Sequence, residues 1–510
     1  MAAVKVSQFG GIAPRRHPTQ LADGMAVTAH NCRLKPGKLV PLRQPRLVAG
    51  AGVLLEGGLS DVADARSLHV WRRQDGSFDF LLFPGVTWAV PGNVADDDLT
   101  RLVVSGDRDG DGKAEGPVVY MRGGATGLKR TVPLAKDALP APHAQRNAGQ
   151  GELTDNRRYT RFFVSWVDRY GMESPFSAPS LVQGADGEWV DEDLEYLDGD
   201  AVTVKGFGAK ADYPLAEKIR VYKVVTGSET GRAQFVAEAD ATLESTWTSG
   251  IGFKVKDEDA GEVMPEIEAP PGDLSCVLDV PGAFYCGFSP SRPKTVMFSD
   301  VDLIYSWPTA YRYDVRDNIV ALAVTANRVY AHPDGWPYVL SGTAPEGMSA
   351  AKLAGPAACV SPTGVCVHRN AVYFASNAGL MTIYSSADAG TVCENVTDGI
   401  FTKDQWLAHN PSSCVMGQHD GALFLFFTLA DGTHRGLVID LKENAATAER
   451  GRWRTPPASS ASAHTSRRTR FRRARSRGPG WCSRAGTRRR TGRAPRSRTA
   501  RGSTAASRAS

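Results

Sequence analysis

The sequence lacks any run of about 18 uninterrupted apolar residues, and its start, MAAVKVSQFGG, has one lysine and no apolar stretch of signal-peptide length. We therefore expect no secretion and no membrane anchor, and we expect synthesis in a cytoplasm. The 8 cysteines lack the Cys-x-x-Cys spacing of structural zinc sites. This pattern predicts free, mostly buried thiols.

Catalytic motifs are also lacking. We find no Gly-x-Ser-x-Gly, no His-Glu-x-x-His, no phosphate-binding loop and no Rossmann glycines. Some histidines lie in the C-terminal half and read as surface or turn residues: His368, His409, His419 and His434. Three carboxylates could supply a glycosidase pair, although sequence does not give their separation: Asp300, Asp302 and Asp314. We predict a non-enzymatic protein without a cofactor.

The charge is divided unevenly along the chain. Residues 458–510 contain 16 Arg and no Lys, Asp or Glu, which leaves 44 basic against 55 acidic residues, a net charge of −11, for residues 1–457. The rest of this tail is almost entirely Ser, Ala, Gly, Thr and Pro, with too little apolar mass to offset the entropy of chain ordering. We predict an acidic body and a disordered, arginine-rich tail.

Two interpretations of the tail stay open. As a nucleic-acid-binding arm, it would neutralise phosphates and release their counterions. As the product of an out-of-frame reading, it would carry this same bias toward residues with GC-rich codons. The body contains 16 Lys and 28 Arg whereas the tail contains no Lys, and the change comes abruptly after GRWRTPPAS. This contrast favours the frameshift.

Helical periodicity is absent beyond about two turns. The one exception is 22–29, where small and apolar residues at helical spacing follow a possible Asp cap and predict a short helix. Most segments are instead four to eight residues, rich in Val, Leu, Phe and Trp, and bounded by Gly, Pro or Asp, such as SLHVWRRQ, FDFLLFP, TWAVP, LTRLVVSG and GPVVYMRGG. The chain is predicted to be all-β.

Residues 153–268 form a predicted second unit. RYTRFFVSWVDRY alternates aromatic and polar residues, and AVTVKGF, EKIRVYKVVTG, QFVAEAD and STWTS follow an acidic loop. Several short strands within about 100 residues are typical of a β-sandwich. The Tyr-rich strand, the Gly-x-Glu-Ser-x-x-Ser phrase and Ile-Arg-Val-Tyr-Lys resemble a fibronectin type III domain. Such a module implies spacing or binding.

Residues 269–457 repeat one plan. NIVALAVTANRVYAHPDGWPYVLSG, CVSPTGVCVHRNAVYFASNAGLMTIYSS and SCVMGQHDGALFLFFTLADGTHRGLVIDL each hold a strand, a polar turn, an aromatic-rich strand, a second turn and another strand. A spacing of about 45 residues with about four strands per unit predicts β-propeller blades. Residues 51–152 have the same texture, so we expect a propeller built from N- and C-terminal segments with the sandwich inserted between them.

The most specific local motif is DRDGDG. It places Asp107, Asp109 and Asp111 at alternate positions before Gly112, as at the start of a calcium loop. The pattern fails at loop position 12, where Val118 stands in place of a bidentate Glu. A hairpin turn rich in Asp and Gly is the favoured interpretation, with calcium binding as the alternative.

An aromatic cluster, IYSWPTAYRY, contains Tyr305, Trp307, Tyr311 and Tyr313. It fits a sugar- or base-stacking platform, but aromatic side chains also fill cores and interfaces. Packing is the favoured interpretation.

The opening stretch, FGGIAPRRHPTQLADGMAVTAHNCRLKPGKLVPLRQP, is too polar and too interrupted to form a core by itself. Its Gly-Gly-Ile-x-Pro start, its small residues leading to Asn-Cys-Arg-Leu and its Gly-x-Leu-x-Pro-Leu-Arg-x-Pro close resemble the N-terminus of the tail nozzle or tail tubular protein B group of short-tailed bacteriophages. MFSDVDLIYSWP is similar to a Phe-Ser…Trp-Pro phrase of that family. The Asp-rich insertion, the sandwich and the arginine tail depart from it.

The resemblance implies a virion protein of the phage tail, made in the bacterial cytoplasm. It further implies a homo-oligomeric ring, commonly of six subunits, that contacts other tail or portal and adaptor proteins and lets DNA pass without sequence-specific binding. Residues 1–50 would then be an extended clamp that lies along other strands or a neighbouring subunit. An acidic body suits such a conduit because basic walls would retain DNA.

A different class of function stays open. A carbohydrate- or host-surface-binding propeller, with or without glycan hydrolase activity, would use the aromatic and carboxylate clusters instead.

Overall fold

The computed structural model describes residues 10–35, 38–42, 52–73, 75–92, 97–122, 129–224, 232–256, 258–326, 328–355, 357–386, 390–441 and 452–454. The predicted tail, 458–510, lies outside them, as do both ends of the opening stretch. Within these residues the α-helices are α1 (Glu244–Ser249) and α2 (Lys403–Leu407), and none is long and apolar enough to cross a membrane. Strands make up nearly all other regular structure, so the predicted all-β class is confirmed.

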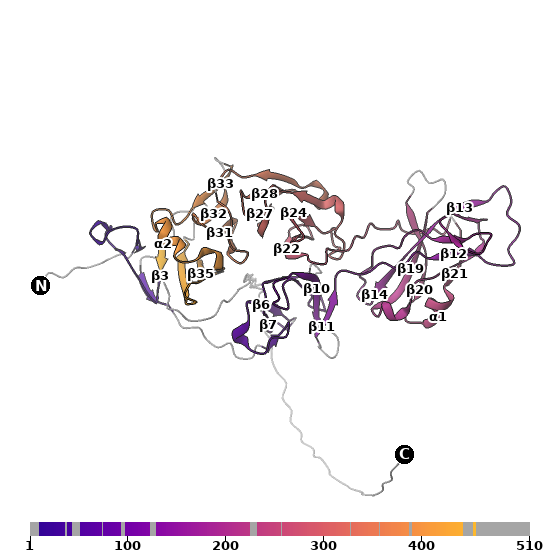
Figure 1. Cartoon of the computed structure of the whole chain (residues 1–510), viewed down its shortest axis with the longest axis horizontal. Helices are drawn as coiled ribbons and strands as arrows, with labels where there is room; N and C mark the ends of the chain where they lie inside the picture. The colour runs from indigo at the N-terminus through magenta and orange to yellow at the C-terminus, as the bar shows by residue number, and fades with distance from the viewer. Residues whose placement is uncertain are drawn as a thin grey trace, which may run out of the picture. The chain divides into compact units, whose positions relative to one another are not determined.

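Six sheets of three or four strands each, among the described residues, follow one another along the chain outside the 153–268 unit (Figure 1). The first contains β5 (Gly52–Leu55), β6 (Ser67–Arg72) and β7 (Phe78–Phe83). The second contains β8 (Thr87–Pro91), β9 (Leu102–Gly106), β10 (Glu115–Arg122) and β11 (Lys129–Pro133). The strands predicted in this region from their apolar runs are therefore present.

The other four sheets lie C-terminal to residue 269. They are β22 (Ser275–Val280), β23 (Phe284–Ser289), β24 (Arg292–Phe298) and β25 (Arg312–Asp314); then β26 (Ile319–Val324), β27 (Arg328–Pro333), β28 (Tyr338–Ser341) and β29 (Ser349–Lys352). Next come β30 (Val365–His368), β31 (Ala371–Ser376), β32 (Gly379–Ser386) and β33 (Gly390–Asn395); then β34 (Val415–His419), β35 (Ala422–Thr428), β36 (His434–Asp440) and β37 (Arg452–Arg454). Each is an antiparallel sheet in sequence order, which matches the predicted repeat of about four strands.

Successive sheets pack face to face because the second to fifth sheets are apolar on both faces. In β9, Val104 enters the core shared with the first sheet, whereas Val103 enters the core shared with the third. In β31, Phe374 faces the fourth sheet, and Tyr373 faces the sixth. Neighbouring residues of a strand point to opposite faces, so a run of apolar residues fills two cores at once.

Two sheets enclose a separate core in the second unit. One contains β12 (His143–Arg146), β15 (Leu181–Gln183), β16 (Trp189–Val190), β18 (Ala201–Lys205) and β21 (Ile251–Lys254), and the other contains β14 (Phe162–Asp168), β19 (Ala216–Val224) and β20 (Ala233–Asp240). A small pair adds β13 (Arg158–Thr160) and β17 (Leu194–Tyr196). Phe162 and Val204, from opposite sheets, are both fully buried in this core. β12 pairs with β15 and β18, so the sheet includes residues that precede the predicted start at 153.

The described residues of the N-terminal clamp contain a 3-10 turn, Pro18–Gln20, but no α-helix, so the helix predicted over 22–29 is wrong. β1 (Gly11–Ile12) pairs in parallel with β2 (Met25–Ala26), and β3 (Cys32–Lys35) pairs with β4 (Lys38–Pro41). The Ala13 amide donates to the Ala26 carbonyl at 2.8 Å. Tertiary hydrogen bonding overrides helix propensity here because a segment this short is a marginal helix alone.

Candidate functional site

The predicted calcium residues lie in the turn between β9 and β10. Both carboxylate oxygens of Asp107 accept backbone N–H groups, from Gly110 at 2.7 Å and from Gly112 at 3.1 Å. Asp111 accepts the amide of Lys113 at 2.8 Å. These bonds are those of Asp residues that stabilise a turn. Among the described residues no group of three or more His, Cys, Asp or Glu side chains is arranged to hold a metal ion, and calcium binding stays a prediction.

The three carboxylates considered for glycan hydrolysis occupy local positions. Asp300 accepts the amide of Val301 at 2.8 Å, and Asp314, in β25, accepts the hydroxyl of Thr295 at 2.6 Å. Asp302 stands in a left-handed backbone conformation, φ 59°, between β24 and β25. Asp300 and Asp314 are therefore used in local hydrogen bonds, and Asp302 occupies a left-handed position in a loop.

The predicted aromatic cluster contributes to cores. Trp307 is 1% exposed, and its indole N–H donates to the Ile304 carbonyl at 2.7 Å. Tyr313 donates its hydroxyl to the Pro345 carbonyl at 2.7 Å and accepts the Met348 amide at 3.2 Å. These two rings therefore pack in the structure and hold neighbouring loops in place, which agrees with the packing role favoured from the sequence.

The four histidines singled out from the sequence differ in burial. His368 and His419 end β30 and β34, and His434 begins β36. His409 is 9% exposed among the rings of Phe401, Trp406 and Phe427, and burial together with the Arg435 charge lowers its pKa. It is thus a core residue.

His332 of β27 lies in no motif that the sequence singled out, yet its surroundings are more unusual than those of the four histidines above. It is 1% exposed, its ring centroid lies 4.6 Å from that of Phe374, and neither ring nitrogen has a hydrogen-bond partner. Burial lowers the pKa of His332 from 6.5 to about 3. It is therefore neutral at physiological pH.

Arg33 of β3 fastens the clamp to the sixth sheet. Its guanidinium donates to Asp440 of β36 at 3.0 Å and to Asp420 of the β34–β35 turn at 3.0 Å. The Arg33 side chain is 12% exposed, and its Cζ lies 6.0 Å from the centroid of the Phe424 ring. A partly buried Arg between two carboxylates makes strong, directional hydrogen bonds.

The start of the clamp is held by main-chain contacts near α2. Ile12 is buried in the core of the sixth sheet. The Arg15 amide donates to the Ile400 carbonyl at 3.0 Å, and the Gln405 side chain donates to the Pro14 carbonyl at 3.1 Å. The sixth sheet and its helix thus organise a stretch that is too polar to form its own core.

A crevice of about 480 Å³ lies between the clamp and α2. Its wall includes Arg15, Trp406 and Lys403, and Arg15 forms an exposed ion pair with Asp398 at 3.4 Å. The Trp406 indole N–H is already used by the Ser376 carbonyl at 2.7 Å. The ion pair belongs to the docking of the clamp, whereas the indole hydrogen bond joins α2 to the end of β31.

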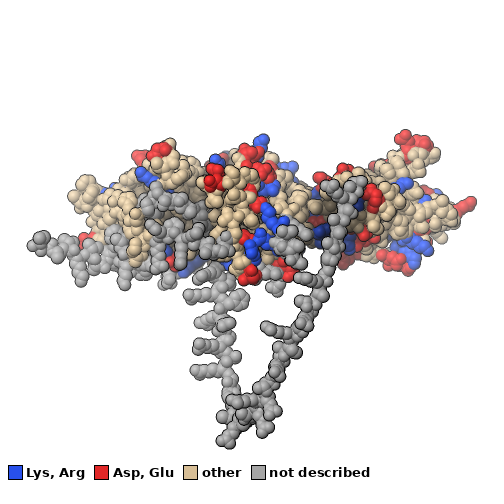
Figure 2. Space-filling model, turned by 90° about the horizontal axis from the view of Figure 1, so that it is seen from below, with Lys and Arg blue, Asp and Glu red and all other residues tan. Residues whose placement is uncertain are grey.

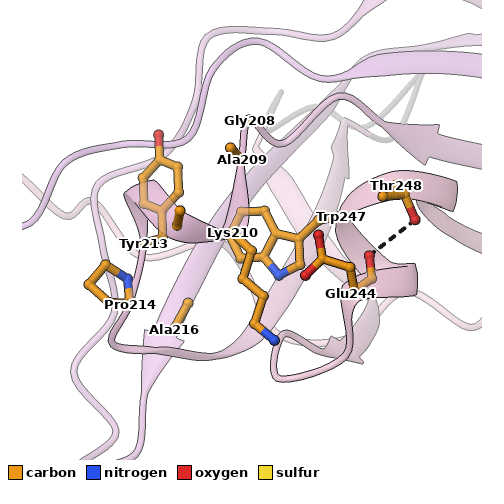
Figure 3. A pocket seen from close by; sticks show the side chains of 10 residues that line it. Gly208, Ala209, Lys210, Tyr213, Pro214, Ala216, Glu244, Trp247 and Thr248 are labelled. Atoms are coloured by element: carbon orange, nitrogen blue, oxygen red, sulfur yellow. Dashed lines mark hydrogen bonds between the residues drawn. The ribbon is translucent and has the colours of Figure 1, made fainter.

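A second hollow, of about 650 Å³, lies in the second unit (Figure 3). It is lined by Gly208, Ala209, Lys210, Ala211, Tyr213, Pro214, Ala216, Glu244, Trp247 and Thr248. They come from the 3-10 turn Lys210–Asp212, the start of β19 and helix α1. No sequence pattern predicted this site, because two segments about 30 residues apart supply its two charged side chains.

Charge is mixed on the surface. Figure 2 shows Lys and Arg interspersed with Asp and Glu on the described part of one face. In the second unit, for example, Arg161 bonds to Asp191 at 2.5 Å and Arg158 to Asp198 at 3.2 Å. Exposed pairs of this kind contribute little to stability.

Comparison with known proteins gives no assignment. No family model matches the chain, and no curated protein matches it. Solved structures align weakly: a functionally unknown protein from Desulfotomaculum acetoxidans has 10% identity and a TM-score of 0.21, over 53% of this chain and 77% of that one. A suspected 6-phosphogluconolactonase from Bacteroides fragilis has 10% identity and a TM-score of 0.26, over 70% and 86%. AztD from Citrobacter koseri has 12% identity and a TM-score of 0.20, over 58% and 94%.

Proposed function

We propose that this chain is a structural subunit of the tail of a short-tailed bacteriophage, of the nozzle or tail tubular protein B kind. Copies of it assemble side by side into a ring, of six subunits by analogy with that family, through which DNA leaves the particle. The subunit is made in the bacterial cytoplasm and joins other tail or portal and adaptor proteins in the virion.

The observation that carries this proposal is the docking of the opening stretch. The residues that resemble the phage family lie on the last of six packed sheets, and Arg33 joins Asp440 across 407 positions of sequence. The segment that precedes the first sheet docks on the last sheet and so connects the two ends of the series, as closure of a β-propeller requires. We therefore assign the six sheets as blades and the inserted unit as a fibronectin type III-like sandwich.

The charge of the body supports a conduit. Residues 1–457 carry a net charge of −11. Non-specific DNA binding arises mainly from Lys and Arg contacts to phosphates, so a body with excess carboxylates retains passing DNA less than a basic one.

Negative-stain electron microscopy and mass photometry of the purified chain test the proposal. We expect rings with a central hole and a mass of about six subunits, since soluble homo-oligomers generally have closed symmetry. The same measurement on a chain without residues 458–510 separates ring assembly from association through the basic tail. Monomers at every concentration, for both chains, would contradict the proposal.

A further inference from the structure

The hollow in the second unit has a rigid aromatic wall. The rings of Tyr213 and Trp247 stack with centroids 5.6 Å apart and planes 14° apart, and Tyr213 meets Trp166 edge-on at 6.1 Å. The Tyr213 hydroxyl donates to the Ala138 carbonyl at 3.2 Å, and the Trp247 indole donates to the Ala241 carbonyl at 2.8 Å. Both rings are fixed before any ligand arrives, which reduces the ordering cost of binding.

Two charged side chains of opposite sign lie beside this wall (Figure 3). The Lys210 ammonium donates one hydrogen bond to the Thr242 carbonyl, which leaves two N–H donors. The Glu244 carboxylate has no hydrogen bond or ion pair to another described side chain. The carboxylate of Asp240 also lies near Lys210, and those of Asp137 and Asp212 lie near Tyr213. The hollow therefore offers donors and acceptors together, in surroundings with more carboxylates than ammonium groups, which disfavours an anionic ligand.

Small residues keep the hollow open. At Gly208, φ is +86°, and an added Cβ would lie 3.3 Å from Cε2 of Tyr213, so a larger residue is disfavoured on both counts. Apolar side chains flank the lining: Leu215 is 39% exposed and Leu243 is 53% exposed. The volume of about 650 Å³ is within the usual range of ligand sites.

We propose that this hollow binds a neutral carbohydrate. A sugar presents an apolar C–H face, which packs on a ring such as Tyr213, and hydroxyl groups, which both donate and accept hydrogen bonds. Glu244 accepts from such hydroxyls and Lys210 donates to them. The site belongs to the sandwich and does not depend on ring assembly.

Other ligand classes fit less well. An extended peptide binds by adding to a free strand edge, but β19, the strand in the lining, is paired on both sides by β14 and β20. An acidic or phosphorylated ligand would place negative charge near Glu244. A purely apolar ligand would leave both charged groups without compensation.

Isothermal titration calorimetry of the full chain tests the site, with cellobiose, maltose, lactose and N,N′-diacetylchitobiose as probes. We expect saturable binding of at least one disaccharide, weakened about tenfold or more by Lys210→Met and by Glu244→Gln, because each removes a hydrogen bond to a charged group. Lys256→Met and Glu258→Gln are the matched controls, since these residues form an exposed ion pair at 3.3 Å in the same unit outside the hollow.

Two results would overturn the inference. One is the absence of saturable binding for all four disaccharides by a folded chain whose melting temperature is the same with and without each disaccharide. The other is binding that the Lys210 and Glu244 variants weaken no more than the controls do. Neither result bears on whether the chain forms rings, so the two proposals fail separately.

Discussion

At the scale of single residues, His332 makes the stability of the fold depend on pH. Its ring is buried against Phe374, and no titratable partner offsets the loss of water around a charged imidazole. The folded pKa, about 3, lies below the unfolded value of 6.5. Below pH 6.5 the unfolded chain therefore binds a proton that the folded chain refuses, and protonation favours unfolding until the pH reaches the folded pKa.

We predict that His332 makes the fold about 2 kcal/mol less stable at pH 5 than at pH 7, from 1.36 kcal/mol per pKa unit. Urea unfolding across pH 4 to 7 measures this, with His332→Leu as the comparison. Between pH 7 and pH 5, the free energy of unfolding of the variant should fall by about 2 kcal/mol less than that of the unaltered chain, whatever its absolute stability. The other histidines contribute equally to both chains. Parallel pH profiles for the two chains would show that His332 is not responsible.

At the scale of elements, the Arg33 side chain joins the clamp to the sixth sheet. Arg33 satisfies Asp440 and Asp420 together, and the Asp440 side chain is only 15% exposed. Removing the guanidinium takes one ion-pair partner from a partly buried carboxylate, which is costly. The clamp amides that bond to the body should then open more often.

We predict that Arg33→Met speeds hydrogen exchange at the Ala13 and Arg15 amides about tenfold, which corresponds to about 1.4 kcal/mol of lost local stability. Hydrogen-exchange mass spectrometry of peptides within 10–35 measures the effect. Arg157→Met is the control, because Arg157 forms an exposed pair with Glu195 at 3.4 Å in the second unit. Equal exchange in both variants would mean that main-chain contacts alone hold the clamp.

At the scale of the whole molecule, the charge division predicts where DNA binds. Deleting residues 458–510 changes the formal net charge from +5 to −11. We predict that the full chain retains duplex DNA at about 50 mM salt and releases it at about 200 mM, and that the deletion abolishes retention at both, since counterion release needs the arginines.

Electrophoretic mobility shifts at the two salt concentrations check this prediction. A chain that lacks only 502–510 is the control because it loses a single arginine. Retention that survives deletion of 458–510 would place the DNA-binding surface in the body, against an inert conduit.

Much of the fold could be predicted from local patterns. Alternating and continuous apolar runs located β6 to β10, and the recurrence of aromatic-rich strands located the four-stranded sheets C-terminal to residue 269. The failure over 22–29 has a physical cause, since the bonds that decide it run to Gly11, Ile12 and Ala13 instead of along a helix.

Little of the candidate site could be predicted. Tyr213 and Trp247 form one wall only because the segment that follows the 3-10 turn Lys210–Asp212 packs against helix α1. Likewise, Lys136 and Asp168 form an ion pair at 2.6 Å with side chains 2% and 1% exposed, although either looks like a surface residue in sequence. Burial lowers the pKa of Lys136 against the opposing effect of Asp168.

By itself the sequence determined the all-β class, the positions of most strands and the contrast between acidic body and basic tail, because periodicity and charge are properties of neighbouring residues. Only the tertiary structure decided that the clamp lies on the sixth sheet, that β12 joins the second unit and that a charged hollow opens there. Contacts between distant residues leave no local pattern, since their free energy arises only when the sheets pack.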